Sequence, residues 1–391
     1  MKNIRTPQDL ALHGAVPAFA ESLHVGRPNM GDRAAFMQYA NDIFDRRWLS
    51  NNGPLVQQFE REIEAHLGVK HCVAMCNGTI ALEIAIRALG MEGEVIVPSY
   101  TFVATAHALQ WQSITPVFAD IDPVTHLLSP DAVRRMITPR TTGIIGVHLW
   151  GRAAPVRELQ DIADEHGLKL MFDAAHAFSC MHQGRMIGNF GACEVLSFHA
   201  TKFFNTFEGG AVVTNDDELA QTMRLMRNFG FAGFDRVVHP GTNGKMVEIN
   251  AAMGLVNLQA LDDVVDANRR NYHAYRDALR DVRGLRLLSM ETGERHNYQY
   301  VVVEVGPECP ATRDQLIDAL QAENVIARRY FWPGCHNMEP YRSLFPHAGL
   351  MLPHTGVVAA RVIVLPTGQT MDGDMIATVV QIMRMRIQEL G

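Results

Sequence analysis

Short apolar runs alternate with stretches of helical spacing through most of the first 215 residues of the chain. An apolar run of about four to eight residues predicts a buried strand, whereas apolar positions three and four apart predict a helix. The predicted strands lie at 71–76, 94–98, 115–120, 142–148, 168–173, 194–198 and 210–215. Because predicted helices separate most of these strands, the pattern indicates a largely parallel sheet that helices cover on both faces.

The predicted helices begin after an irregular arm, because the first thirty or so residues show no regular period. Gly68 closes the second predicted helix, as a glycine at a helix end does. The helices of this part are predicted at 32–45, 54–68, 79–90, 103–112, 129–137 and 156–167. Ligands of such folds bind at the carboxyl ends of the strands, so polar residues that follow the strands are the candidates for a site.

The last third of the chain changes character. A long helical stretch at 250–282 leads out of the predicted sheet domain. The elements predicted after it are strands at 297–305, 325–333 and 360–366 and helices at 313–324 and 374–390. We therefore predict an α/β fold, with a mostly parallel central sheet and a smaller C-terminal α+β domain. The N-terminal arm and the large domain take residues 1–264, and the small domain takes residues 265–391.

Composition and charge argue against two kinds of partner. The chain has 391 residues, of which 47% are hydrophobic and 20% charged, as in an ordinary globular protein. Its formal net charge is −7 and it has no basic block, so we expect no nucleic-acid partner. No apolar run reaches the ~18 residues of a membrane helix, and the first residues lack the apolar core of a signal peptide. We therefore expect a cytoplasmic protein that does not contact membranes.

The cysteines do not indicate a metal site or disulfides. None of the six forms a CxxC pair, so we expect no metal and take them to be free thiols. They are Cys72, Cys76, Cys180, Cys193, Cys309 and Cys335. Cys335 stands beside His336, which suggests a Cys–His nucleophile, but residues adjacent in sequence seldom meet as a catalytic pair.

Polar and aromatic residues follow the first two predicted strands. Gly78 and Thr79 stand between a strand and a helix. The amides and the dipole of a helix N-terminus make a phosphate site, although Asn-Gly-Thr is equally an ordinary turn with a helix cap. Tyr100 and Phe102 lie just past the next strand, where such a ring either stacks on a flat ligand or fills the core.

Asp173 follows a buried apolar run directly. A carboxylate there is costly unless a positive group pairs with it, and the protonated ring nitrogen of a cofactor is one such group. The alternative is that Asp173 caps a following helix. His176 comes three residues later, and it lies on the same side if the chain turns helical.

Lys202 is one of only five lysines in the chain, and it alone has candidate cofactor groups on neighbouring strand ends. It follows Ser197, which ends a predicted strand, and it precedes Gly209 and Gly210, past which a bulky group can approach the backbone. An amine at this edge, near a phosphate site, an aromatic ring and an aspartate, indicates a Schiff base with pyridoxal phosphate. The alternative is a solvated surface lysine.

These residues, in this order, resemble those of the fold type I pyridoxal-phosphate enzymes. More specifically they resemble the DegT-type sugar aminotransferases, which act on nucleotide-linked keto sugars. The resemblance covers nearly the whole chain and rests on six ordered motifs: "WLSNNGPLVQQFE", "CNGTIALEIAIRALG", "VPSYTFVATAHA", "FDAAHA", "SFHATKFFNTFEGGAVVT" and "GTNGKMVEINAAMGL". Six motifs in a fixed order make a specific signal, because one motif alone matches easily by chance.

The resemblance implies a cofactor, either pyridoxal 5′-phosphate held by Lys202 as an internal aldimine or pyridoxamine phosphate. It implies that Asp173 pairs with the pyridine nitrogen. It also implies that Phe102 lies over the ring and that His176 lies near the ring hydroxyl. The implied phosphate ligands are Gly78, Thr79 and Ser197.

The resemblance further implies a homodimer with shared active sites. Asn243 matches an asparagine that the family extends across the dimer interface to the partner's phosphate. The chain departs from the family at Lys245, where the family usually has arginine. We assign no consequence to that exchange.

The lysine motif also bears on the substrate. Its "SFHATK…EGG" form resembles members that aminate C4 of a 6-deoxy sugar, whereas members that aminate C3 tend to carry "YPGKN". We therefore expect amino transfer, with L-glutamate as donor, to a dTDP-4-keto-6-deoxyhexose, which yields the 4-amino-4,6-dideoxy sugar. Tyr330 and His336 are candidates to line the sugar pocket, and a purely structural role is an equal alternative for both.

Three other functions are compatible with the same motifs. They are an aminotransferase for a 3-keto sugar or a keto-inositol, a sugar dehydratase of the same fold, and a non-catalytic regulator that binds the cofactor. The dehydratases have histidine in place of the lysine, so Lys202 favours transamination. A regulator is disfavoured because the set of catalytic positions is full and the sequence has no added basic helix-turn-helix.

Overall fold

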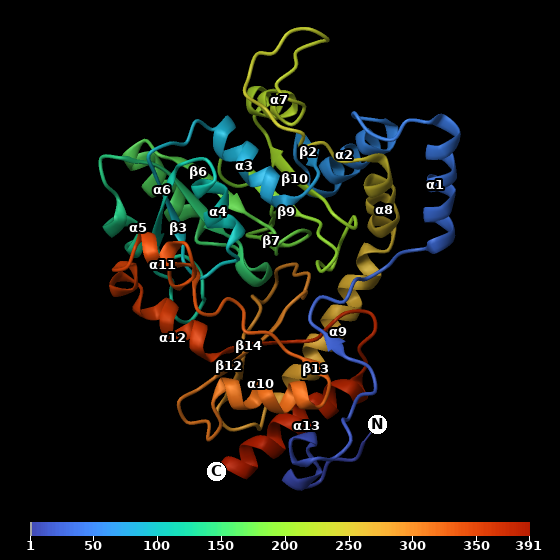
Figure 1. Cartoon of the computed structure of the whole chain (residues 1–391), viewed down its shortest axis with the longest axis vertical. Helices are drawn as coiled ribbons and strands as arrows, with labels where there is room; N and C mark the ends of the chain where they lie inside the picture. Colours follow the sequence, from blue (N-terminus) through green and yellow to red (C-terminus); the bar gives the residue numbers. More distant parts are fainter. Residues whose placement is uncertain (1) are drawn as a thin grey trace.

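The computed structural model describes residues 2–391 and has a seven-stranded sheet in its larger part (Figure 1). In space the strands follow the order β2 (His71–Met75), β10 (Gly210–Thr214), β9 (Glu194–Ser197), β6 (Lys169–Asp173), β5 (Thr141–Val147), β3 (Glu94–Pro98) and β4 (Thr115–Ala119). β10 runs antiparallel to both of its neighbours, and the other neighbouring pairs are parallel. The prediction of a mostly parallel central sheet is confirmed.

Both faces of this sheet are apolar and covered by helices. Successive residues of a strand point to opposite faces, and in β3 Val95 and Val97 face one way and Ile96 the other, all fully buried. The first face is covered by α3 (Gly78–Ala88), α4 (Ala104–Gln110) and α7 (Asp217–Met226). The second is covered by α2 (Pro54–Leu67), α5 (Pro130–Met136), α6 (Val156–His166) and α8 (Glu248–Gln259), and α1 (Arg33–Arg46) packs beside α8.

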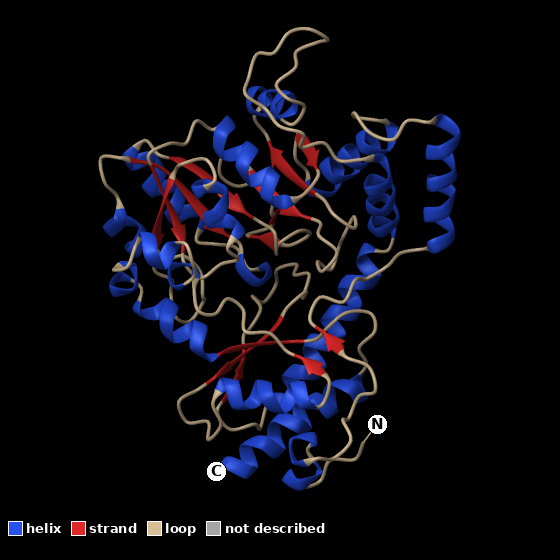
Figure 2. Cartoon of the chain, viewed as in Figure 1, coloured by secondary structure: helices blue, strands red, loops and turns tan. Residues whose placement is uncertain are grey.

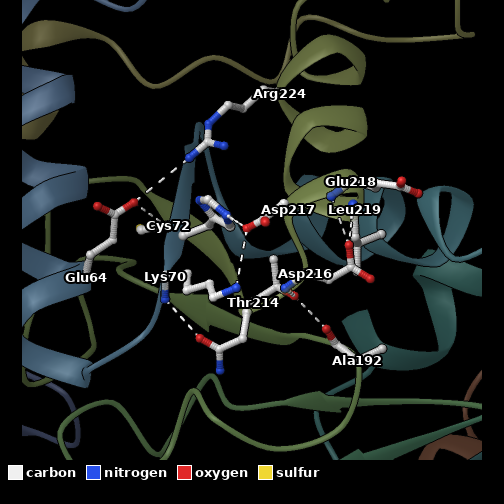
Figure 3. A network of polar contacts seen from close by, with 12 residues as sticks. Glu64, Lys70, Cys72, Ala192, Thr214, Asp216, Asp217, Glu218, Leu219 and Arg224 are labelled. Carbon is white, nitrogen blue, oxygen red and sulfur yellow. Dashed lines mark hydrogen bonds and ion pairs between the residues drawn. The ribbon is translucent and has the colours of Figure 1, made fainter.

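Helix α7 was not among the predicted elements, although its start is marked in the sequence. The Asp216 carboxylate accepts hydrogen bonds from the amides of Glu218 and Leu219, both at 2.9 Å, and so caps the helix. Figure 3 shows this cap in a polar network that also includes Asp217. The Oδ1 atom of Asp217 lies 2.8 Å from Nε2 of His71. The network lies at the paired ends of β2 and β10, at His71 and Thr214, on the side of the sheet opposite its carboxyl edge.

The last third of the chain forms a second sheet (Figure 2). It is antiparallel, and its strands are β11 (Leu285–Leu287), β12 (Val301–Val305) and β14 (Val362–Leu365). The helices that pack on it are α9 (Leu261–Leu279), α10 (Arg313–Ala322) and α13 (Gly373–Leu390). Helix α9 runs from the large sheet toward this one (Figure 1). The division near residue 265 that we propose between 1–264 and 265–391 therefore falls inside α9.

Shorter elements complete the chain. The helices are α11 (Tyr341–Leu344) and α12 (Pro353–Arg361), and the 3-10 helices are Pro7–Asp9, Ala11–His13, Leu149–Gly151, Cys335–Asn337 and Ala348–Met351. A two-stranded hairpin consists of β7 (Met181–His182) and β8 (Arg185–Met186).

Three predictions for the last third were wrong in extent. The stretch 250–282 is two helices, because Ala260 leaves the helical conformation with φ −95° and ψ 5°. The strand predicted at 297–305 begins at Val301, since the buried side chains of Asn297 and Gln299 bond to other segments. The strand predicted at 325–333 ends at Ile326, beyond which the chain turns and presents aromatic rings to a cavity.

The N-terminal arm is irregular, as predicted, but it is anchored. Its strand β1 (Leu23–His24) pairs in parallel with β13 (Val325–Ile326). The fully buried carboxylate of Glu323 accepts hydrogen bonds from the amides of Ala11 at 2.6 Å and Ala18 at 2.5 Å. The sequence pattern does not reveal this anchoring, because the bonded residues lie 305 and 312 positions apart.

Candidate active site

A cavity of about 330 Å³ opens at the carboxyl edge of the large sheet, where residues of the small domain complete its wall. Strands and loops that are far apart in the sequence meet there. The cavity brings together eight of the predicted site residues: Gly78, Thr79, Phe102, Asp173, His176, Ser197, Lys202 and Tyr330.

One end of the cavity is the N-terminus of α3. Asn77 caps the helix with its side chain, so the ordinary cap that the sequence suggested is present. Gly78 and Thr79, the first helical residues, also line the cavity beside Ser197. A Cβ added to Gly78 would lie 3.1 Å from the Cβ of Ser197, a tight contact that would narrow this corner. The corner suits an anion, because helix amides and a hydroxyl converge on it.

Asp173 ends β6 and is 6% exposed. Its Oδ2 accepts a hydrogen bond from Thr105 Oγ1 at 2.8 Å, and its Oδ1 accepts one from the amide of Ala175 at 3.1 Å. No helix follows Asp173, so the alternative that it caps one is wrong. Burial raises the pKa of its carboxyl group, and the two donors and the Lys202 amine partly oppose that rise. Nothing in residues 2–391 forms an ion pair with this carboxylate, which leaves it open to a positive group of a ligand.

Lys202 lies in the loop that connects β9 to β10. The loop is held from within, because the amide of Lys202 donates to the carbonyl of His199 at 2.8 Å and that of Thr206 donates to the carbonyl of Phe198 at 2.9 Å. Burial in the cavity wall lowers the pKa of the Lys202 amine to about 8, against an opposing pull from Asp173. A larger fraction of this amine is therefore unprotonated near neutral pH than of a solvated lysine, which favours nucleophilic attack.

The His176 ring is buried and packed among aromatic rings. Its Nδ1 accepts a hydrogen bond from the amide of Trp150 at 3.4 Å, and its ring stacks on Trp150 and Phe331, each with 5.8 Å between centroids. Burial holds the pKa of His176 well below its usual value, and the positive Lys202 adds to this. Because Nδ1 accepts, the neutral ring carries its proton on Nε2 and can donate from there. The chain around His176 is a turn, not the helix considered from the sequence.

The two aromatic residues after β3 have different roles. Tyr100 is a core residue, 1% exposed, and its hydroxyl donates to the carbonyl of Tyr330 at 2.6 Å. Phe102 lines the cavity with 59% of its surface exposed, and its centroid lies 6.4 Å from that of Phe331. An exposed ring at a cavity wall is suited to cover a flat ligand.

Two predicted site residues lie outside this cavity. His336 is 5% exposed and its Nδ1 bonds to Ser99 Oγ at 2.7 Å, so it does not line the cavity and we do not retain it as a substrate residue. Its neighbour Cys335 donates to the carbonyl of Thr101, and burial raises the pKa of its thiol to about 12, which rules out a Cys–His nucleophile. Asn243 is exposed and bridges to Asn228, away from the cavity of its own chain. Its role at a partner's site stays a prediction.

Several residues of the site were not predicted. Thr105 is fully buried and does not line the cavity, but it bonds to Asp173 from the start of a helix that looked like ordinary packing. Tyr300 and Phe331 were assigned to strands of the small domain. His199 and Glu208 also line the cavity, and His199 Nε2 lies 3.4 Å from Glu208 Oε1. Their position inside the lysine motif was the one feature of the sequence that could have identified them.

The described residues contain neither a cluster of metal-binding side chains nor a membrane-spanning helix. Among residues 2–391 no group of His, Cys, Asp and Glu side chains is placed to hold a metal ion. Of the helices in that range, none has the length and apolar character needed to span a membrane.

Comparison with known sequences gives matches along most of the chain. The profile of the DegT/DnrJ/EryC1/StrS aminotransferase family matches residues 31–384. The dTDP-4-amino-4,6-dideoxy-D-glucose transaminase of Shigella dysenteriae is 35% identical over 362 residues, which cover 93% of this chain and 98% of that protein. The GDP-perosamine synthase of Caulobacter vibrioides is 37% identical over 313 residues, or 78% of this chain and 84% of that protein.

Solved structures share the fold. The structure of DesI, determined in the presence of its TDP-sugar product, is 49% identical with a TM-score of 0.93, over 97% of this chain and 96% of that one. PseC of Helicobacter pylori, an aminotransferase of pseudoaminic acid biosynthesis, is 24% identical with a TM-score of 0.87, over 94% of this chain and 100% of that one. These similarities confirm the predicted fold type I architecture.

Proposed function

The chain belongs to the DegT/DnrJ/EryC1/StrS aminotransferase family, whose members depend on pyridoxal phosphate, and on that premise we propose its substrates. The amino acceptor is a dTDP-linked 4-keto-6-deoxyhexose, the product is the 4-amino-4,6-dideoxy sugar, and the donor is an amino acid, L-glutamate first. A nucleotide-sugar aminotransferase of this kind is supported by the dTDP-sugar transaminases and by DesI among its relatives.

One observation carries the proposal: an amine of lowered pKa, an unpaired buried carboxylate and a helix N-terminus face the same cavity. Each of the three matches one part of pyridoxal phosphate. The anion corner of Gly78, Thr79 and Ser197 would hold the phosphate. Asp173 would bind the ring nitrogen and Lys202 the aldehyde carbon.

The rest of the cavity suits the flat ring. Phe102 would cover one side of it, and the Nε2–H of His176 is a donor for the ring hydroxyl. These assignments rest on the lining of the cavity and on the family motifs. No residue of the set would leave a buried charge unpaired once the cofactor is bound, because Asp173 gains its positive partner.

When bound here, pyridoxal phosphate would supply a carbonyl group that accepts the amine and a ring that accepts the electrons of the broken C–H bond. The chain's residues orient the reactants and move protons. Asp173 would keep a proton on the ring nitrogen of the cofactor, because a carboxylate beside a cation favours the charged form. The Lys202 amine, with a pKa of about 8, would take the proton from the Cα of the amino donor, and in the second half of the reaction it would deliver a proton to the former keto carbon of the sugar. The aromatic rings of Tyr300, Tyr330 and Phe331 keep water from this exchange.

A homodimer with shared sites remains part of the proposal. The observation that supports it is the place of Asn243, which is exposed on the surface and does not line its own chain's cavity. If it serves the partner's phosphate site, each cavity is complete only in the dimer.

The test is a comparison of acceptors. The protein is loaded with pyridoxal phosphate and incubated with L-glutamate and one of three acceptors: dTDP-4-keto-6-deoxyglucose, its 3-keto isomer, or GDP-4-keto-6-deoxymannose. We expect the first to give an aminated product by mass spectrometry, with the amine at C4 by NMR. Amination of only the 3-keto sugar would refute C4 as the position that receives the amine. Amination of only the GDP sugar would refute dTDP as the nucleotide of the acceptor. The Lys202→Ala variant is the control, and product formed at the wild-type rate in that variant would overturn the assignment of the lysine.

A further inference from the structure

The N-terminal arm crosses the loop that carries Lys202. After β1 the chain runs through residues 25–29 against residues 199–206, before it reaches α1. Gly26 has φ +76°, and a Cβ added there would lie 2.7 Å from the carbonyl oxygen of Thr201 and 3.0 Å from its Cβ. Glycine alone accepts both that conformation and that contact. The arm therefore touches the residue immediately before Lys202.

Asn29 binds the same loop on the other side of the lysine. Its Nδ2 donates to the carbonyl of Phe203 at 3.1 Å, and its own carbonyl accepts from Nδ2 of Asn205 at 3.0 Å. Asn29 is 6% exposed, so water does not compete well for these bonds. The loop is thus held at the residue before Lys202 and at the first and third residues after it.

The remaining acceptor of Asn29 reaches the small domain. Its Oδ1 accepts from the amide of Gln369 at 3.1 Å, and the side-chain Oε1 of Gln369 accepts from the amide of Met30 at 3.3 Å. The segment that holds Gln369 follows β14 and is fixed by Asn271 of α9, whose Nδ2 donates to the carbonyl of Gly368 at 2.9 Å. One buried amide therefore joins the lysine loop, the arm and the small domain.

We propose that Asn29 and Gly26 are positioning residues, through which the arm fixes Lys202 in the cavity and ties the lysine to the small domain. The inference rests on the proposed function, in which Lys202 bonds the cofactor. Neither Gly26 nor Asn29 lines the cavity, so each acts through the loop and not on the cofactor.

The chain offers a matched control for this idea. Asn271 is also a buried asparagine, 5% exposed, and its Nδ2 donates to Thr367 Oγ1 at 3.2 Å and to the Gly368 carbonyl. It holds the same small-domain segment as Asn29 but forms no hydrogen bond with the lysine loop. Asn271→Ala should therefore lower the stability of the protein as Asn29→Ala does, but it should not change the amide exchange of the lysine loop.

The experiment measures amide hydrogen exchange of residues 199–206 in the full-length chain, with and without added pyridoxal phosphate. In Asn29→Ala and Gly26→Ala we expect this segment to exchange at least about tenfold faster than in the wild type, as when one buried hydrogen bond is lost. In Asn271→Ala it should exchange at the wild-type rate. The second readout is the dissociation constant of pyridoxal phosphate, followed by its visible absorbance, which we expect to rise about tenfold in the arm variants only.

The outcomes separate this inference from the proposed function. Wild-type exchange of residues 199–206 in both arm variants, or equal acceleration in Asn271→Ala, would overturn the positioning role. Faster exchange with an unchanged dissociation constant would likewise overturn it, because the loop would move without affecting the lysine. A wild-type protein that takes up no pyridoxal phosphate would refute the proposed function, and the exchange data would still decide whether the arm fixes the loop. If Gly26→Ala does not fold, Asn29→Ala decides alone.

Discussion

Asp173→Asn should stabilise the cofactor-free protein while it weakens cofactor binding. The carboxylate is 6% exposed, accepts two hydrogen bonds and has no ion pair within residues 2–391. An asparagine of the same shape keeps both bonds. Its oxygen still accepts from the amide of Ala175, and its new N–H₂ group donates to Thr105 Oγ1, whose own proton turns to Thr101 Oγ1 at 3.2 Å. The substitution therefore removes little besides the buried charge.

The removal of the buried charge sets the size of the gain in the free energy of unfolding. A buried polar group without full compensation costs roughly 1–3 kcal/mol. Here two donors and the Lys202 amine offset part of that cost. We therefore expect Asp173→Asn to raise the free energy of unfolding of the cofactor-free protein by about 1–2 kcal/mol at neutral pH. With the cofactor bound we expect the wild type to be the more stable of the two proteins, because asparagine cannot hold the proton on the ring nitrogen.

The pH dependence of the gain checks its cause. Burial raises the pKa of Asp173, so the folded protein holds that proton more tightly than the unfolded chain does. The cost of the charged carboxylate is absent below the unfolded pKa of about 4, and it grows as the pH rises through the folded pKa. The advantage of Asp173→Asn should be full at neutral pH and shrink as the pH falls.

Urea unfolding of the cofactor-free proteins at one fixed protein concentration measures the effect. The control is Asp216→Asn, which changes an exposed helix cap that also accepts two amide bonds and should shift stability by less than about 0.5 kcal/mol. If Asp173→Asn is less stable than the wild type at neutral pH, or if its advantage grows toward acid pH, the account of Asp173 as an unpaired buried charge is refuted.

Four further predictions concern the lysine, the phosphate corner and the dimer. Lys202→Ala should keep the wild-type urea midpoint, show no visible cofactor band and lose activity by on the order of 10³-fold, and a retained band would contradict it. In cofactor-free protein an amine reagent should label Lys202 half-maximally at about pH 8, with labelling that rises as the pH rises, whereas a midpoint near 10.5 would show a solvated amine. Gly78→Ala should weaken pyridoxal phosphate binding about tenfold, because its Cβ meets Ser197, and Gly356→Ala, which meets nothing within 4 Å, should not. Asn243→Ala should lower cofactor affinity without dissociating the dimer in light scattering, and a fully active wild-type monomer would disprove the shared site.

The strands of the large sheet could be predicted from the sequence because each one is marked by a short run of apolar residues. Strands such as β3 are buried on both faces, so residues like Val95, Ile96 and Val97 form unbroken apolar runs that few other elements produce. The small domain was less readable. Its aromatic residues serve a cavity wall and not a sheet, and an aromatic run such as Tyr330–Phe331 has the same local signature in both settings.

Site residues were predictable where they directly follow an apolar strand in the sequence. Asp173 ends β6 and Lys202 lies in the loop that follows β9, and parallel strands bring such positions to one edge of the sheet. Thr105 was not found, because its contact with Asp173 spans 68 residues and depends on how α4 packs. The surroundings of His336 could not be read from the sequence for the same reason, since its Nδ1 bonds to Ser99, 237 residues away.

The single antiparallel strand has a consequence for how this edge of the protein can change. Because β10 runs antiparallel to β9, the chain leaves the sheet at Ser197 and re-enters it at Gly210, and these two residues are partners in the strand register. The loop between them is a closed hairpin connection whose two ends are pinned by paired strands. Phe203, Phe204, Asn205 and Thr206 of this connection are buried, so an insertion there would displace Lys202 together with the cavity wall. A protein engineer who wishes to alter what enters the cavity should therefore change the segments of the small domain that line it and leave this hairpin intact.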